Sequence, residues 1–98
     1  MATEKRKEEH LDIALKENVS FRHVTTGLEK VLLQYNCLPD ISLDDVDTSA
    51  EFLGKKFKAP LMVSAITGGT ERAKKINRDI AKACQKCGVG MGLGSQRA

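Results

Sequence analysis

The feature that most constrains this chain is an amphipathic segment, residues 71–87, that lies between two short apolar runs. Within the segment, apolar residues recur at steps of three and four, which is the period of a helix with one buried face. Thr70 is suited to cap the start of this helix and Gly88 to end it. The spacing therefore predicts a helix over residues 71–87.

The apolar runs on both sides of this helix predict strands. Residues 60–66 are almost continuously apolar and begin with a proline, which is typical of a strand buried on both faces. Residues 89–93 alternate apolar residues with glycine, so one face of that strand carries almost no side chains. Strand, helix and strand predict one right-handed βαβ unit of an α/β fold. The turns that follow the strands, 64–69 and 92–97, would then open at the same end of a parallel sheet.

The glycines of the second strand leave two interpretations open. Their spacing of two, after a helix, does not match the dinucleotide fingerprint, which follows a strand and opens a helix. Glycines along one strand face favour either a flat ligand close to the backbone or a crowded barrel interior.

The N-terminal half is less regular. Its apolar stripe predicts a short amphipathic helix over residues 4–18, and Gly27, Pro39 and Gly54 punctuate the segment 19–59. We expect a short helical or extended piece at residues 28–35 and a small hairpin near residues 48–58. The chain thus divides into residues 1–59, a helix with an irregular and hairpin lead-in, and residues 60–98, the strand-helix-strand unit.

Composition excludes several classes of function. The 98 residues include 16 basic and 13 acidic side chains that mostly interleave, which does not indicate a nucleic-acid surface. No window is apolar enough to span a membrane and no signal sequence begins the chain, so we expect a cytoplasmic protein. Three cysteines make an odd count, and we expect Cys84 and Cys87 to be buried packing residues of one helix face. Cysteines and histidines show no metal-ligand spacing, so no metal ligand is expected within this chain.

Short motifs occur in a fixed order along the chain: Arg6-Lys7 with His10, Leu38-Pro39, Leu53-Gly54-Lys55, Ala59-Pro60-Leu61, Ile66-Thr67-Gly68-Gly69, Ile76-Asn77 and Gly94-Ser95-Gln96-Arg97. In combination they resemble the N-terminal part of the type 2, flavin-dependent isopentenyl-diphosphate isomerases. The resemblance covers nearly the whole chain from Arg6 onward. At Ile66 that family commonly has methionine, which is a conservative difference.

The resemblance implies a (β/α)8 TIM barrel, of which this chain would supply the N-terminal part and the first strand-helix-strand. It implies an enzyme that converts isopentenyl diphosphate to dimethylallyl diphosphate with reduced FMN, NADPH as the reductant and Mg²⁺. A homo-oligomer is implied as well. We expect the catalytic and metal-binding residues to lie beyond Ala98, and the chain to be inactive alone.

The resemblance also assigns site residues. It implies that Ala65, Ile66, Thr67 and Ser95 contact FMN, and that Arg6, Lys7, Ser95, Gln96 and Arg97 bind substrate. The chemistry agrees, because arginine and lysine make charge-assisted hydrogen bonds to a diphosphate. His10 either pairs with a phosphate or lies on the polar side of its helix, and the second is favoured. Asn77 is expected to tie a neighbouring loop by hydrogen bonds.

Two alternative functions remain. One is another FMN-dependent barrel oxidoreductase, such as a relative of the α-hydroxy-acid oxidases or of IMP dehydrogenase. The paired cations at Arg6 and Lys7 fit diphosphate handling better than hydride removal from a hydroxy acid. The other is a non-catalytic module whose basic helix contacts an acidic partner.

Overall fold

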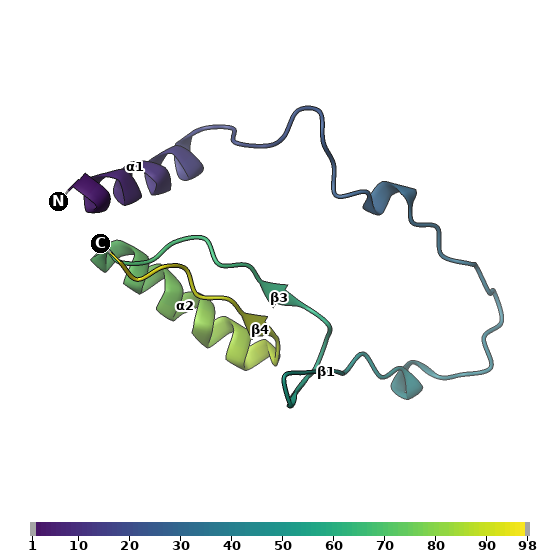
Figure 1. Ribbon diagram of the computed structural model, residues 1–98. Coiled ribbons are helices and arrows are strands. Elements are labelled where there is room, and N and C mark those ends of the chain that lie inside the picture. Colours follow the sequence, from purple (N-terminus) through teal and green to yellow (C-terminus); the bar gives the residue numbers. More distant parts are fainter. Residues whose placement is uncertain (1, 98) are drawn as a thin grey trace.

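The ordered part of the chain is a βαβ unit with one helix and one hairpin attached to it (Figure 1). The computed structural model describes residues 2–97. Along the chain the elements are α1 (Ala2–Lys16), two short 3-10 turns (Leu28–Lys30 and Leu43–Asp45), β1 (Ala50–Phe52), β2 (Lys55–Phe57), β3 (Met62–Val63), α2 (Glu71–Cys87) and β4 (Gly90–Met91).

Strands β3 and β4 pair in parallel, as the βαβ interpretation predicts. Met62 lies opposite Gly90 and Val63 opposite Met91, and the amide of Gly92 donates to the carbonyl of Val63 at 2.8 Å. Within residues 2–97 the first strand is not covered on both faces, because Met62 remains 50% exposed. Helix α2 covers one side of the strand pair, and among residues 2–97 no further strand flanks it.

Helix α2 forms where its sequence predicts it. The Thr70 hydroxyl accepts the amide of Ala73 at 3.1 Å, and Gly88 ends the helix in the left-handed conformation with φ 68°. Ala73 and Cys84 are buried. The expectation that Cys87 is also buried is wrong. Three residues correspond to 300° around a helix, so Cys87 lies roughly 60° away from the line of Cys84.

The predicted hairpin is confirmed as β1 and β2, which pair antiparallel with Ala50 opposite Phe57. The rings of Phe52 and Phe57 lie 6.5 Å apart between centroids. A hydrogen bond of 2.8 Å from the amide of Lys58 to the carbonyl of Gly88 attaches the hairpin to the end of α2. The hairpin therefore closes the end of the βαβ unit that lies away from the two turns (Figure 1).

Helix α1 begins at Ala2 and ends at Lys16. Both ends lie two residues before the ends of the predicted range 4–18. The Asn18 side chain accepts the amide of Ser20 at 3.0 Å, and this local turn competes with helix continuation. Leu11 is the one residue of α1 that is buried. The helix lies near the C-terminal turn, so segments from the two ends of the chain meet (Figure 1).

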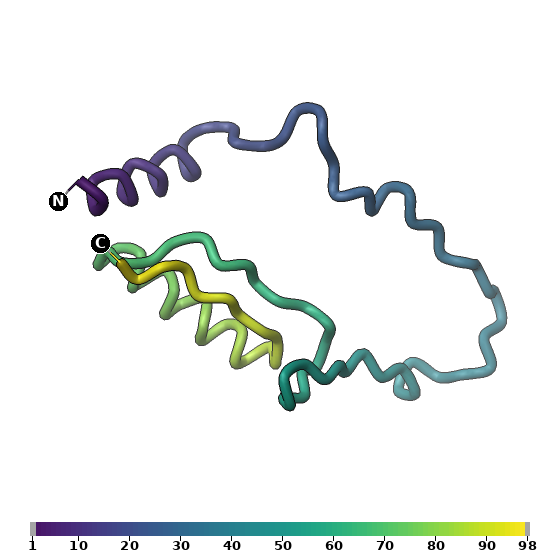
Figure 2. Tube along the Cα trace, viewed as in Figure 1, coloured from purple at the N-terminus to yellow at the C-terminus, as the bar shows by residue number. Residues whose placement is uncertain are grey.

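Residues 17–47 form an extended segment that loops away from the rest of the molecule (Figure 2). The predicted piece at residues 28–35 is present only as the turn Leu28–Lys30. Large apolar side chains of this segment are exposed, among them Leu32 and Leu33 at 92% and 90%. The radius of gyration is 18.4 Å, whereas a compact domain of this length has about 13 Å. Most of the apolar surface of this segment is therefore not covered by residues 2–97.

Candidate functional site

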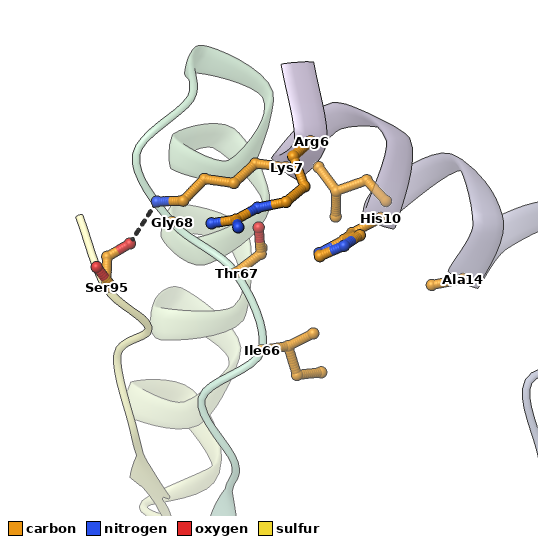
Figure 3. A pocket seen from close by; sticks show the side chains of 9 residues that line it. Arg6, Lys7, His10, Ala14, Ile66, Thr67, Gly68 and Ser95 are labelled. Atoms are coloured by element: carbon orange, nitrogen blue, oxygen red, sulfur yellow. Dashed lines mark hydrogen bonds between the residues drawn. The ribbon is translucent and has the colours of Figure 1, made fainter. Parts of the chain in front are cut away.

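The candidate site is a cavity of about 190 Å³ where α1 meets the turns that follow β3 and β4 (Figure 3). Helix α1 supplies the cationic side, and the turn after β3 supplies most of the other side. The lining residues are Arg6, Lys7, His10, Leu11, Ala14, Ile66, Thr67, Gly68 and Ser95. The predicted meeting of both turns at one end of the parallel strand pair is confirmed.

Two cationic side chains and one imidazole of the site come from one side of α1. Arg6, Lys7 and His10 are separated by one, three and four positions, so they project from neighbouring points of the helix surface. Figure 3 shows their side chains extending from α1 toward the turn that carries Thr67. The geometry thus places positive charge and hydrogen-bond donors along one wall of the cavity, a chemistry suited to an anion.

Lys7 also links α1 to the second turn. Its ammonium donates a hydrogen bond of 3.0 Å to the carbonyl of Ser95 and another to the carbonyl of Arg97. An ammonium has three donors, so one remains for a ligand. The sequence prediction assigned Lys7 to substrate alone and missed this link, because residues 88 and 90 positions apart in the chain leave no local signal.

The two turns touch backbone to backbone. A Cβ atom at Gly94 would lie 2.5 Å from the carbonyl oxygen of Thr67, and one at Gly68 would lie 2.6 Å from that of Ser95. Only residues without a side chain permit so close an approach. The glycines therefore make the turns one continuous surface beside the cavity.

Asn77 supports this surface from behind. Its side-chain amide donates to the carbonyl of Thr67 at 3.0 Å, in a partly buried position on α2. The prediction that Asn77 ties a neighbouring loop is confirmed.

The remaining predicted site residues lie around the rim. Gln96 folds back, and its side-chain amide donates to the carbonyl of Gly94 at 2.7 Å. Ala65, Gln96 and Arg97 are exposed and do not line the cavity. Ile66 is 80% exposed and lies at the cavity edge.

An ion pair joins α1 to α2 beside the site. The Arg72 guanidinium donates to Asp12 Oδ1 at 2.7 Å and lies 3.4 Å from Glu8 Oε2. The hydrogen bond from Arg72 and the nearby Lys16 ammonium lower the pKa of the Asp12 carboxyl from its ordinary value. The helical period predicts Arg72 on the polar face of its helix but does not identify this contact. The available signal was that Glu8 and Asp12 are four apart, and so share one side of α1.

The described residues contain neither a cluster of metal-binding side chains nor a membrane-spanning helix. Within residues 2–97, no group of three or more histidine, cysteine or carboxylate side chains is placed to hold a metal ion. None of the helices in the same range combines the length and apolar character needed to cross a bilayer.

Comparisons with known proteins agree on one family. Residues 2–98 match the family described as FMN-dependent dehydrogenase. The chain is 50% identical over 95 residues to an isopentenyl-diphosphate delta-isomerase from Nostoc sp., covering 97% of this chain and 27% of the relative. The chain is also 50% identical over 92 residues to the protein of that name from Rickettsia prowazekii, and this match covers 94% of this chain and 27% of that relative. The identity to the protein of that name from Methanococcoides burtonii is 46% over 98 residues, which covers 100% of this chain and 27% of that relative. The chain therefore spans about a quarter of the length of these curated relatives.

Proposed function

The chain belongs to the family of FMN-dependent dehydrogenases, and we propose that it forms part of an isopentenyl-diphosphate delta-isomerase. Such an enzyme converts isopentenyl diphosphate to dimethylallyl diphosphate. The observation that carries this proposal is the cavity in which cations of α1 face the two glycine-bearing turns. Relatives of this name at 46–50% identity over nearly the whole chain support it.

The cavity suits the substrate's two chemical parts. Isopentenyl diphosphate joins a strongly anionic head to a short hydrocarbon tail, and the lining joins Arg6, Lys7 and His10 to the apolar Leu11, Ala14 and Ile66. Its volume of about 190 Å³ is below the roughly 300–1,000 Å³ of sites for drug-sized ligands. It fits a small diphosphate ester rather than an entire flavin.

Each polar residue takes a role in binding the diphosphate. Arg6 is exposed on the cavity wall, and its planar guanidinium can bind phosphate oxygens bidentately. Lys7 contributes its remaining N–H, and Ser95 also lines the cavity, so that its hydroxyl can add a second donor. Gln96 and Arg97 at the rim, with His10, complete the set of proposed substrate ligands.

The surface formed by the two turns fits a flavin ring. Thr67 and Gly94 meet without intervening side chains, Ile66 adds an exposed apolar side chain, and hydroxyls of Thr67 and Ser95 lie at its edge (Figure 3). We assign Ala65, Ile66, Thr67 and Ser95 to hold FMN there. Reduced FMN, when bound, supplies proton transfer at the allylic carbons without net oxidation.

The wider assembly follows from the same proposal. Strands β3 and β4 would be neighbouring strands of a (β/α)8 barrel, whose further strands cover the exposed face of Met62. NADPH would reduce the flavin, and Mg²⁺ would bind to the substrate diphosphate and to residues outside 2–97. The complete enzyme would be a homo-oligomer.

The test uses the complete protein that carries this sequence, incubated with FMN, NADPH, Mg²⁺ and isopentenyl diphosphate. We expect dimethylallyl diphosphate to form. In Arg6→Ala the KM for isopentenyl diphosphate should rise at least about tenfold, since hydrogen bonds to charged groups contribute about 1.5 kcal/mol or more. Arg22→Ala, at an exposed arginine outside the cavity, is the matched control. Absence of product from the wild-type protein would refute the proposed reaction.

The family description favours one second candidate, an FMN-dependent dehydrogenase of hydroxy acids. Such an enzyme would reduce its flavin at the expense of a 2-hydroxy acid, which bleaches the oxidised flavin absorbance. Bleaching by a 2-hydroxy acid, together with no isomerisation, would favour this candidate.

A further inference from the structure

We propose that Arg72 is a positioning residue that holds helix α1 over the cavity through Asp12 and Glu8. The docking of α1 follows from the structure alone. Its effect on substrate binding rests on the proposed function, because it acts on Arg6, Lys7 and His10.

The covalent connection of α1 does not set its position. Beyond Lys16 the chain continues into the exposed, irregular segment 17–47. A connection of this kind allows its ends many relative positions. Within residues 2–97, the place of α1 is therefore set by its noncovalent contacts with the βαβ unit.

Three contacts are available for this purpose. Leu11 is 8% exposed and is the buried apolar contact, whereas Ala14 and Leu15 line a cavity between α1 and the βαβ unit and do not close it. Lys7 fixes one end of α1 to the carbonyls of the second turn. Arg72 contacts α1 at Glu8, which follows Lys7, and at Asp12, about one turn further along, and completes a second polar attachment.

The geometry of Arg72 suits it to orient a helix. Thr70 caps the start of α2, so Arg72 projects from a helical turn whose backbone is fixed. Glu8 and Asp12 are one turn apart on α1, and contact with both defines the rotation of α1 about its axis as well as its height. A guanidinium has several donors in a fixed plane and can serve two carboxylates, whereas a lysine ammonium is a point charge.

The exposure of the three charged side chains indicates that their ion pairs orient α1 rather than stabilise the whole fold. The side chains of Arg72, Asp12 and Glu8 are 41%, 46% and 37% exposed. Ion pairs of this exposure contribute little to unfolding free energy and are screened by salt. They suffice to choose among orientations of a helix that is otherwise held by few contacts.

The experiment compares Arg72→Leu with Arg78→Leu in the complete protein. Both remove one arginine from the same helix, and Arg78 is exposed with no ion pair within the described residues. Amide hydrogen exchange over residues 2–16 reports the docking of α1. Steady-state kinetics with isopentenyl diphosphate report its effect on substrate.

In Arg72→Leu we expect faster exchange in α1, and a KM for isopentenyl diphosphate raised about two- to fivefold with kcat nearly unchanged. Arg78→Leu should match the wild type in both. The double variant Arg72→Glu with Asp12→Arg should regain part of the exchange protection, because it restores an opposite-charge contact. High salt should reduce the difference between Arg72→Leu and the wild type.

Unchanged exchange in Arg72→Leu would overturn the proposal, and so would faster exchange without any change in KM. The exchange readout does not require the proposed reaction, so a protein without isomerase activity would still test the docking. If Arg72→Leu does not fold, Glu8→Gln with Asp12→Asn tests the same contact from α1 and leaves α2 intact.

Discussion

The side-chain amide of Asn77 donates a hydrogen bond of 3.0 Å to the backbone carbonyl of Thr67, ten residues earlier in the chain. The bond joins the inner face of α2 to the turn after β3. The proposed flavin surface is therefore held by the helix that follows it.

Replacing Asn77 by leucine should weaken FMN binding. The substitution removes the donor and leaves the Thr67 carbonyl without this partner, at a cost of about 1 kcal/mol, or about fivefold in affinity. Fluorescence titration of the complete apoprotein with FMN measures it. Gln85→Leu removes an exposed amide from the same helix and should not change the affinity. Equal affinities for all three proteins would show that this hydrogen bond does not shape the FMN site.

A methyl group at Gly94 should separate the two turns. Its carbon would lie 2.5 Å from the Thr67 carbonyl oxygen, and because the obstacle is backbone, the turn itself must move. We expect Gly94→Ala to lose most FMN binding. Gly54→Ala is the control, since it meets no atom within 4 Å and incurs only the roughly 1–2 kcal/mol of its left-handed conformation. Retention of FMN by Gly94→Ala would contradict the close approach of the two turns.

Thr70→Ala should lower the stability of the βαβ unit. The hydroxyl of Thr70 accepts the amide of Ala73 in a buried position, and loss of such a cap costs about 1 kcal/mol. Thermal unfolding of the complete protein should show a lower Tm for Thr70→Ala, and Thr70→Ser, which keeps the oxygen, should recover most of the difference. Similar Tm values for the two variants would argue against capping as the source of the effect.

Docking of α1 should weaken in acid. Arg72 lowers the pKa of the Asp12 carboxyl in the folded chain. The contact between Asp12 and Arg72 therefore stabilises the docking of α1 fully above the ordinary pKa of about 3.9, and this stabilisation is lost as the pH falls through the folded pKa. Glu8 also faces Arg72, and Lys16 lies 3.6 Å from Asp12. Corrected for intrinsic exchange rates, protection of α1 should be constant from about pH 5 to 8 and fall below about pH 4.

The variant Asp12→Asn distinguishes the contribution of the Asp12 carboxyl from the contributions of neighbouring acidic groups. The variant should show reduced protection of α1 at neutral pH and a smaller loss on acidification. An acid-induced loss of the same size in the variant would assign the effect to Glu8 or to other groups.

Local signals predicted the parts of the fold that depend on neighbours in sequence. Thr70, the apolar period and Gly88 define α2 within a residue of its ends. The hairpin near residues 48–58 was predicted with Gly54 as a punctuating residue, and the role of Asn77 followed from its amide on the apolar stripe of its helix. Each of these signals lies within the element that it describes.

Nonlocal contacts could not be predicted in the same way. Lys7 meets Ser95 and Arg72 meets Asp12 across 88 and 60 positions, and a charged residue on a helix surface gives no sign of its partner. The burial of residues 60–66 depends on nonlocal contacts in the same way. An apolar strand indicates that it can be covered on two faces, but covering it requires neighbouring strands that residues 2–97 do not contain.

The backbone contact between the turns also limits how this sequence can diverge. At Gly68 and at Gly94, the space that a side chain would need is filled by the backbone of the opposite turn, so a side chain at either position requires that turn to move. A substitution at one becomes tolerable only after the opposite backbone has moved, and that movement displaces Ser95 and Thr67 together. A substitution at either glycine therefore alters the ligand contacts of Ser95 and Thr67, although neither glycine offers a side chain to a ligand.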